Sequence, residues 1–361
     1  MKPIRQLLSL ARSAWRRLPV EKRREIRRRL HPAVRARLNR AFPGPNAVKN
    51  LGLLSVVVPV FNVEEYLEDC LSSIAAQSYP HLDVVVVDDG SSDGSLRIAR
   101  AFARRDRRFR VLTKPNAGLG AARNTGVAFA KGDFLAFADS DDVVPRNGYE
   151  VMMRSLNHSR SDFVVGSVTR LRGRNRELPA WARSVHRVTR TGTTLAEFPE
   201  ILHDVFAWNK IFRKEFWDRE VRAFPEGVLY EDQETTARAY AHASAFDVLH
   251  EVVYEWRIRA DRSSITQQKT ELVDVRDRIL VARRLARFVE TLPDATVRDF
   301  WFAKVLGEDL GLYYVQIPRV SQDYWDLLRV GVQEITTRSS AGGVVAAVGA
   351  GPDSGTSSSP G

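Results

Sequence analysis

Short apolar runs alternate with helical patterns from about residue 51 onward. The apolar runs are rich in β-branched residues and do not alternate with polar positions, as expected of strands that are covered on both faces. They occupy residues 53–60, 82–90, 109–113 and 133–139. Amphipathic patterns typical of helices lie between them, over residues 64–77 and 94–105 and after the segment NAGLG at 116–120. This order predicts an α/β domain with a doubly wound, mostly parallel sheet.

Other patterns flank this domain, which we expect to span residues 49–265. Residues 1–48 predict a basic amphipathic helical arm and a linker, because apolar residues recur there at helical spacing and FPGPN at 42–46 cannot continue a helix. Residues 266–338 show a mostly 3.6-residue apolar rhythm, which predicts a helical C-terminal region. Residues 339–361 are rich in Gly, Ser and Ala and are expected to be disordered.

The net charge of +11 is concentrated in the arm. Residues 1–50 hold 15 Lys and Arg and two Glu, so the other 311 residues carry a net charge of −2. Basic residues around an apolar helical face are typical of a helix on an anionic membrane surface, where each adds about 1 kcal/mol. We therefore expect residues 1–40 to contact such a surface, although a solvated extension has the same pattern. The near-neutral body argues against nucleic acid as a partner.

The sequence has few signals for membrane insertion, secretion, disulfides or zinc. No run of about 18 apolar residues occurs, and arginines interrupt the N-terminus where a signal peptide has its apolar stretch. The single cysteine, Cys70, excludes an internal disulfide, and no Cys/His spacing resembles a zinc site. We expect a cytoplasmic protein that lies on the inner face of the plasma membrane if the arm binds lipid.

Carboxylates follow two of the predicted strands. Asp88 and Asp89 end the second, and Asp139, Asp141 and Asp142 end the fourth, at the position where doubly wound sheets bind ligands. Such carboxylates repel each other unless a cation lies between them. Mg²⁺ or Mn²⁺ binds one or two carboxylates and completes its shell with water and phosphate oxygens, so the D-x-D spacing predicts a diphosphate substrate. A solvated acidic turn is the alternative interpretation of this spacing.

Two common phosphate-binding motifs are absent from the sequence. GLGAARNTG at 118–126 lacks the third glycine of the dinucleotide fingerprint and follows the third strand instead of the first. No G-x-x-x-x-G-K-[ST] segment occurs. We therefore expect neither a Rossmann cofactor nor a P-loop.

Four segments, taken together and in order, resemble the family 2 glycosyltransferases with the GT-A fold. They are the stretch from VVVPVFN to VVVVDDGSSDGS (56–95), NAGLGAARNTG (116–126), GDFLAFADSDD (132–142) and LYEDQET (229–235). The resemblance covers about residues 53–260 and implies an inverting, metal-dependent transfer of a sugar from a nucleotide-diphosphate donor. WNKIFRKEFWD (208–218) and VVYEWRIR (252–259) are similar to modules that actinobacteria use for cell-wall polymers such as teichoic-acid-type chains.

The resemblance implies a set of donor-binding residues. The nucleobase would be bordered by Pro59, Val60 and Phe61. Asp89 would hydrogen-bond the edge of the base, with Asp88 as its neighbour. The nucleotide and diphosphate would be lined by Asn116, Gly118 and Arg123. The metal, Mg²⁺ or Mn²⁺, would be held by Asp139 and Asp141, with Asp141 the firmer ligand and Asp142 a cap of the following turn.

An inverting transfer also needs a base that takes the proton of the acceptor hydroxyl. The resemblance assigns this role to Asp232, with Glu231 helping to position the acceptor; both acids also suit the first turn of a helix over 231–241. An acceptor-side segment would consist of Trp208, Asn209 and Lys210, although packing of the tryptophan and a solvated lysine explain the same residues. A loop that closes over the diphosphate would use Arg257, Arg259 or Ser263.

The sequence thus predicts a glycosyltransferase that moves a hexose or N-acetylhexosamine. We expect a UDP-sugar donor, with GDP and dTDP left open, and an acceptor hydroxyl on a cell-envelope glycan, a teichoic-acid-type polymer or a lipid-linked intermediate. The alternative is a catalytically inactive GT-A scaffold that binds membrane or nucleic acid through its arm. The presence of Asp139, Asp141 and Asp232 together argues against a scaffold.

Overall fold

The computed structural model describes residues 50–173, 175–259 and 269–340, so the segment expected to form the basic arm and residues 341–361 of the expected disordered tail lie outside the described residues. Residues 339 and 340 of that tail are helical instead, at the end of the helix Gln322–Ser340. Within the described residues, one sheet has nine strands in the order β3-β2-β1-β4-β8-β5-β9-β7, with β6 paired to β5. The strands are β1 Leu54–Val60, β2 Leu82–Asp88, β3 Phe109–Thr113, β4 Phe134–Phe137, β5 Phe163–Arg172, β6 Asn175–Glu177, β7 Arg190–Thr193, β8 Lys210–Arg213 and β9 Phe246–Arg257.

Most strands of this sheet run in one direction. β3, β2, β1 and β4 are parallel neighbours. β8 is antiparallel to both β4 and β5, so β5, together with its parallel partner β9, runs the same way as β1. β6 and β7 are antiparallel to their neighbours. The carboxyl ends of β1, β2, β4 and β9 therefore lie at the same end of the sheet, where α/β folds bind ligands.

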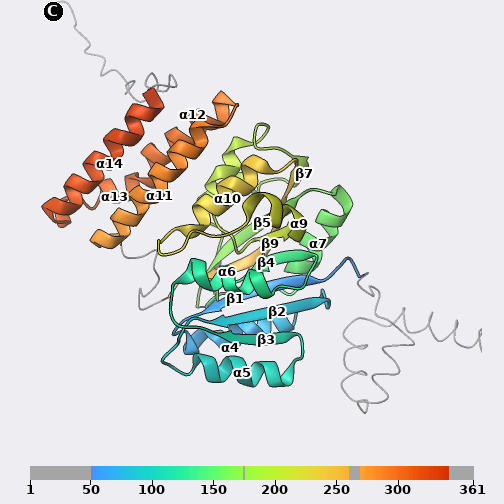
Figure 1. Ribbon diagram of the computed structural model, residues 1–361. Coiled ribbons are helices and arrows are strands. Elements are labelled where there is room, and N and C mark those ends of the chain that lie inside the picture. The colour runs from blue at the N-terminus through green and yellow to red at the C-terminus, as the bar shows by residue number, and fades with distance from the viewer. Residues whose placement is uncertain (1–49, 174, 260–268, 341–361) are drawn as a thin grey trace, which may run out of the picture. The chain divides into compact units, whose positions relative to one another are not determined.

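The central strands are covered on both faces. Every residue of β1, β2 and β4 is buried. Because consecutive side chains of a strand point to opposite faces, complete burial requires cover on both sides. The helices around the sheet provide it (Figure 1).

The helices of the α/β region begin where the sequence allows a sharp change of backbone direction. α6 follows Gly118, whose φ of 90° strongly favours glycine. α10 begins with Glu231 and Asp232, whose carboxylates suit the positive end of a helix. The elements of this region are α4 Glu64–Ala75, α5 Ser95–Arg105, α6 Leu119–Phe129, α7 Gly148–Ser159, α8 Ala180–Val185, η1 Pro199–His203, α9 Lys214–Phe216, η2 Trp217–Val221 and α10 Glu231–His242.

A group of helices follows β9 and packs against α10 through α11 (Figure 1). One hydrophobic core joins Val57 and Phe137 of the sheet, Trp217 of η2, and Ile279 and Tyr313 of this group. The elements are α11 Leu272–Glu290, α12 Ala295–Lys304, η4 Val305–Asp309, α13 Gly311–Tyr314, η5 Ile317–Arg319 and α14 Gln322–Ser340. The C-terminal helices therefore share a core with the α/β region.

The structure confirms the α/β class, the mostly parallel sheet and the helical C-terminal addition. The predicted strand over 109–113 coincides with β3, and the other predicted strands exceed the observed ones by one to three residues. The sequence prediction lacks β8, which begins at Lys210 and lies in the middle of the sheet between β4 and β5. Among the described residues, no helix is both long enough and apolar enough to cross a bilayer.

Candidate active site

Carboxylates and one aromatic ring gather where β1, β2 and β4 end. Phe61 follows β1 directly, Asp88 is the last residue of β2, and Asp139 and Asp141 follow β4. The three strands are parallel neighbours, so these residues lie at one end of the sheet. Asp139 is also fixed by β9, because its backbone N–H donates to the hydroxyl of Tyr254 at 2.9 Å.

The end of β1 presents one ring to solvent. Pro59 and Val60 are buried inside the sheet, whereas Phe61 is 48% exposed. Asn62, at φ 48°, accepts a hydrogen bond from the N–H of Ser92 at 2.8 Å, which ties the end of β1 to the loop after β2. Of the three residues predicted to border a nucleobase, only Phe61 offers its side chain to a ligand.

The two carboxylates at the end of β2 have different environments. Asp89 accepts hydrogen bonds from the N–H groups of Ala117 at 3.1 Å and Gly118 at 2.9 Å, and it pairs with Lys114 at 2.5 Å. Asp88 is 2% exposed, and its Oδ1 has no hydrogen-bond partner among the described residues. Asp89 therefore fixes the segment before α6. The carboxylate with a free acceptor is Asp88, which the sequence had ranked second.

The segment held by Asp89 carries two further predicted residues. Asn116 is exposed, and Gly118 is partly buried. A Cβ on Gly118 would meet no atom within 4 Å, so glycine is favoured there by the φ of 90° rather than by lack of space. Both residues lie beside the ends of the parallel strands, and their contact with a nucleotide stays a prediction.

Arg123 joins two parts of the site. Its side chain is 1% exposed, and its guanidinium pairs with Asp139 at 2.8 Å and with Glu231 at 2.5 Å. The ring of Phe224 lies 5.1 Å below the guanidinium. Both terminal nitrogens thus bond carboxylates of the chain itself, and the predicted contact of Arg123 with a diphosphate stays a prediction.

The D-x-D carboxylates each have an arginine partner. Asp139 pairs with Arg123, and Asp141 accepts a hydrogen bond from Nε of Arg259 at 2.8 Å. Burial raises the pKa of Asp141, and Asp139 adds to the rise while Arg259 opposes it. Asp142 does not cap the following turn, as the sequence had suggested. It is buried and accepts from the N–H of Arg257 at 2.7 Å.

This end of the sheet has the donor set of a hard divalent cation. Burial, and then the charges of Asp141 and Asp139, raise the pKa of Asp142 well above its ordinary value. Asp139 and Asp141 are the least buried of the three and supply two carboxylates. Among the described residues, no cluster of three or more His, Cys, Asp or Glu side chains makes a complete metal site. Residues 139 and 141 thus fit Mg²⁺ or Mn²⁺ only together with substrate and water oxygens.

Glu231 and Asp232 open α10 beside Arg123. Glu231 is buried against Arg123, whereas Asp232 is partly exposed. Burial and the charge of Glu231 raise the pKa of Asp232 to about 8, against the opposing charges of Arg123 and Lys210. A carboxylate with such a raised pKa is a stronger base than an ordinary aspartate.

The backbone before these acids is held by the C-terminal helices. Tyr230 has a φ of 65°, and its hydroxyl donates to Asp274 of α11 at 2.6 Å. Asp274 also accepts from the hydroxyl of Tyr313 at 2.6 Å. The N–H of Leu229 donates to Asp277 at 3.0 Å. These bonds stabilise an uncommon conformation next to the two acids.

The predicted acceptor-side segment is buried. Trp208 is 5% exposed, and Asn209 and Lys210 are each 1% exposed. Trp208 stacks on Tyr254 at a centroid distance of 4.3 Å. The polar groups of Asn209 and Lys210 point to Asp204, at 2.7 and 2.6 Å. They cannot touch an acceptor directly, and Lys210 is not solvated as the alternative interpretation required.

Sequence reasoning missed Asp204 and His186. Both side chains are buried, and His186 Nε2 lies 2.8 Å from Asp204 Oδ2. No motif links these residues to Lys210, because His186 follows α8, Asp204 follows η1 and Lys210 begins β8. The usable signal was the lysine at the start of an apolar run, since a buried lysine needs a carboxylate partner. Arg259, named for a diphosphate loop, bonds Asp141 instead, and Ser263 lies outside the described residues.

Comparison with known proteins identifies relatives. Residues 55–219 match the family model described as glycosyl transferase family 2. The chain is 30% identical over 209 residues to the uncharacterized glycosyltransferase EpsJ of Bacillus subtilis, an alignment that covers 57% of the chain and 61% of EpsJ. It is 29% identical over 216 residues to the poly(ribitol-phosphate) beta-glucosyltransferase of Bacillus spizizenii, covering 58% of the chain and 32% of that protein. The chain spans less than two thirds of both relatives.

A solved structure shares the fold. The chain superposes on S. aureus TarS 1-349 in complex with UDP-GlcNAc with a TM-score of 0.67 and 24% identity. The match covers 79% of this chain and 81% of that one. At this identity the likeness establishes the fold.

Proposed function

Because residues 55–219 match the model of glycosyl transferase family 2 and the chain shares the fold of TarS, we propose that the chain is a family 2 glycosyltransferase, an inverting enzyme that transfers a sugar from a nucleotide-diphosphate donor. The observation that carries this proposal is the position of Arg123 between two carboxylates. Arg123 bonds Asp139 of the D-x-D pair on one side and Glu231, the neighbour of Asp232, on the other. Metal ligands and base, far apart in sequence, are thereby joined in one site.

UDP is the proposed nucleotide. The structural neighbour TarS was solved with UDP-GlcNAc, which supports a UDP-sugar for this chain. Phe61 presents an exposed ring on which a base can stack, and Asp88 has a buried acceptor oxygen that suits an N–H of the base. GDP and dTDP offer rings and N–H groups as well, so the test includes all three nucleotides.

The proposed acceptor is a hydroxyl of a cell-envelope glycan, a teichoic-acid-type polymer or a lipid-linked intermediate. One relative carries poly(ribitol-phosphate) in its name, which supports this class of polymer. Residues 1–48 lie outside the described residues, so their contact with an anionic membrane surface and the resulting cytoplasmic, membrane-peripheral location stay predictions.

The chemistry assigned to Asp232 is proton removal from the acceptor. As a carboxylate it takes the proton of the acceptor hydroxyl while the hydroxyl oxygen bonds to the anomeric carbon. The bond from that carbon to the donor phosphate breaks on the opposite face, and the nucleotide diphosphate leaves with the electron pair. One proton moves to Asp232 and the configuration at the anomeric carbon inverts.

The leaving diphosphate is received at the D-x-D end of the site. When bound by Asp139 and Asp141, Mg²⁺ or Mn²⁺ supplies positive charge that offsets the leaving group. Arg123 holds Asp139 in position, and Arg259 bonds Asp141 at 2.8 Å.

Calorimetric titration with UDP, GDP and dTDP, each with Mn²⁺ and with a chelator, tests the proposed donor site. We expect one nucleotide to bind in a metal-dependent way. Asp141→Ala should remove the metal dependence, because it deletes one of two carboxylate ligands. If none of the three nucleotides binds the wild-type chain, the proposal fails in favour of a scaffold.

Asp232→Asn tests the base. The dissociation constant of the variant for the nucleotide should lie within about twofold of the wild-type value. Its rate of nucleotide release by cleavage of the donor should be at least about 100-fold lower, since a general base contributes about 10²–10⁴-fold to the rate. Glu234→Gln is the matched control, because Glu234 lies in the same first turn and pairs with Arg284 of α11 instead. Retention of most of the wild-type rate by Asp232→Asn would exclude Asp232 as the base.

A further inference from the structure

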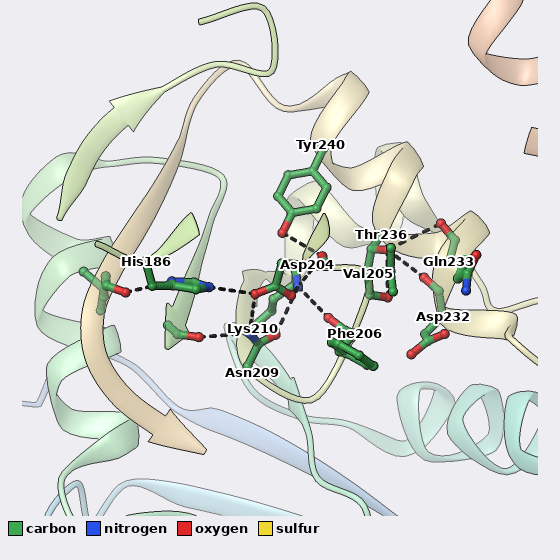
Figure 2. Close-up of polar contacts among 12 residues, drawn as sticks. His186, Asp204, Val205, Phe206, Asn209, Lys210, Asp232, Gln233, Thr236 and Tyr240 are labelled. Atoms are coloured by element: carbon green, nitrogen blue, oxygen red, sulfur yellow. Dashed lines mark hydrogen bonds and ion pairs between the residues drawn. The ribbon is translucent and has the colours of Figure 1, made fainter. Parts of the chain in front are cut away.

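A buried polar cluster lies on the face of α10 that carries Asp232, and the proposed chemistry does not use it. It consists of His186, Asp204, Asn209 and Lys210, each buried (Figure 2). Lys210 donates to Asp204 Oδ1 at 2.6 Å and to the carbonyl of Phe206 at 2.5 Å. Asn209 donates to Asp204 Oδ2 at 2.7 Å. A cluster that removes a lysine from water needs a reason beyond stability, because apolar packing would stabilise the fold equally well.

The cluster fixes the backbone at residues 204–206. Lys210 donates to the carbonyl of Asp204 at 3.2 Å and to the carbonyl of Phe206 at 2.5 Å, so its ammonium links the first and last residues of this turn. His186 Nδ1 faces the carbonyl of Leu249 at 2.9 Å, which anchors the cluster to β9. Asn209 donates to the carbonyl of Gly166 on β5 at 2.9 Å. The turn is therefore tied to two strands of the sheet.

The turn is bonded in its own right to the helix of the base. The hydroxyl of Thr236 lies 3.1 Å from the carbonyl of Val205 and 2.8 Å from the carbonyl of Asp232 (Figure 2). One helical turn further, the hydroxyl of Tyr240 donates to the carbonyl of Asp204 at 3.1 Å. Thr236 and Tyr240, four residues apart on α10, thus both contact the backbone segment that Lys210 bonds.

Lys210 also acts on Asp232 through its charge. The groups whose charges reach Asp232 are Glu231 on the same helix, Arg123 on α6, Asp139 after β4 and Lys210 on β8. The two carboxylates favour the protonated form of Asp232, and the two cations favour the carboxylate. Arg123 is paired with Asp139 and Glu231, and Lys210 is paired with Asp204, so each of these two cations also has a carboxylate partner other than Asp232.

We propose that Lys210, held by Asp204, His186 and Asn209, is a positioning residue for the base: it sets the placement of α10 through Val205 and Thr236. This inference rests on the proposed function and replaces the direct acceptor contact suggested by the sequence. It predicts that the cluster affects turnover and its pH dependence while leaving the nucleotide site intact.

The test measures UDP binding with Mn²⁺ and UDP release from UDP-GlcNAc and UDP-glucose, with water as acceptor, in Lys210→Met, Lys210→Arg and Thr236→Val. We expect the dissociation constants of Lys210→Met and Thr236→Val for UDP to lie within about twofold of the wild-type value. Their rates of UDP release from the donor should fall about 10- to 100-fold, because small displacements of a catalytic group lower rates by this order. The conservative variants Lys210→Arg and Thr236→Ser, measured in the same assays, should recover part of the rate of UDP release. Lys214→Met is the control, because Lys214 is partly exposed and pairs only with Asp218 at 2.6 Å among the contacts described for its side chain.

The pH profile of UDP release separates positioning from general stability. Lys210→Met should move the rising limb to higher pH, since the lost cation no longer favours the carboxylate of Asp232, whereas Thr236→Val should lower the rate and leave the limb in place. If Lys210→Met does not fold, Thr236→Val still decides the geometric step. Release rates within twofold of the wild type in the folded variants, or UDP binding weakened as much as release, would overturn the inference. Absence of UDP binding in the wild type would instead refute the proposed function.

Discussion

Replacing Arg123 with glutamine tests whether this residue holds the site together or binds substrate. Its guanidinium is 1% exposed and pairs with the side chains of Glu231, 7% exposed, and Asp139, 26% exposed. Glutamine keeps some hydrogen-bonding capacity and removes the charge, so the buried carboxylate of Glu231 loses its counter-ion. Breaking a buried pair by removing one partner costs about 3–5 kcal/mol. The more exposed Asp139 adds at most about 1 kcal/mol, because water screens it.

Protonation of Glu231 limits the loss of stability in Arg123→Gln. Burial already raises the pKa of Glu231, with Arg123 opposing the rise, so the unpaired carboxyl takes up a proton more readily in the variant. The net loss therefore lies at the lower end of the range for a broken buried pair, about 3 kcal/mol. A carboxyl with a raised pKa in the folded state destabilises most above that pKa. The difference from the wild type should therefore shrink as pH falls through the raised pKa of Glu231.

Urea unfolding followed by circular dichroism measures this loss, with the nucleotide titration alongside. We expect the free energy of unfolding to fall by about 3 kcal/mol at pH 8 and by less at pH 5, with a melting temperature lower by roughly 6–12 °C. Arg123→Lys should recover only part, because one ammonium cannot bridge two carboxylates as the planar guanidinium does. Arg100→Gln, on the exposed side of α5, is the control. An unchanged unfolding midpoint together with lost UDP binding would show that Arg123 serves the ligand and that the argument is wrong.

Two further predictions concern the base and its support. The value of kcat/KM for the donor should rise with pH, reach half of its plateau near pH 8 and level off above it, because Asp232 works only as a carboxylate and its pKa is raised to about 8 by burial and then by Glu231. Glu231→Gln should shift this limb to lower pH, and a profile flat from pH 6 to 9 would remove Asp232 from the role. Tyr230→Phe and Tyr313→Phe each delete a hydroxyl 2.6 Å from Asp274. Each should lower the free energy of unfolding in urea by about 1–3 kcal/mol, since a buried acceptor loses a donor, and equal midpoints in wild type and variants would contradict this bracing.

The parallel half of the sheet could be predicted because its strands carry their own signal. β1 and β2 are buried throughout and consist mostly of apolar, β-branched residues, and turn residues follow each strand. β8 could not be predicted in the same way, because it has four residues and is stabilised by pairing with β4 and β5, which are distant in sequence. Its register is set by tertiary contacts that no local pattern records.

The residues of the site could be predicted better than their roles. The ordered motifs identified Asp139, Asp141, Glu231 and Asp232, which the structure brings to one site through Arg123. The motif assigns Arg123 to the diphosphate, whereas the structure pairs its guanidinium with Asp139 and Glu231. Sequence does not tell whether an arginine faces a ligand or two carboxylates of its own chain. The same limit applies to Lys210, whose partner Asp204 precedes it by six residues without any motif.

The bonds from Tyr230 to the C-terminal helices bear on how such enzymes recombine. The family match ends at residue 219, before the two acids of α10, and the conformation of Tyr230 depends on Asp274 of α11. A crossover between residues 219 and 231 would separate the matched segment from Glu231 and Asp232. Such a chimaera keeps the conformation of Tyr230 before these two acids only if it also inherits α11, and its core must match across the joint between Trp217 and Ile279. We therefore expect a functional exchange between related chains to involve a piece larger than residues 55–219.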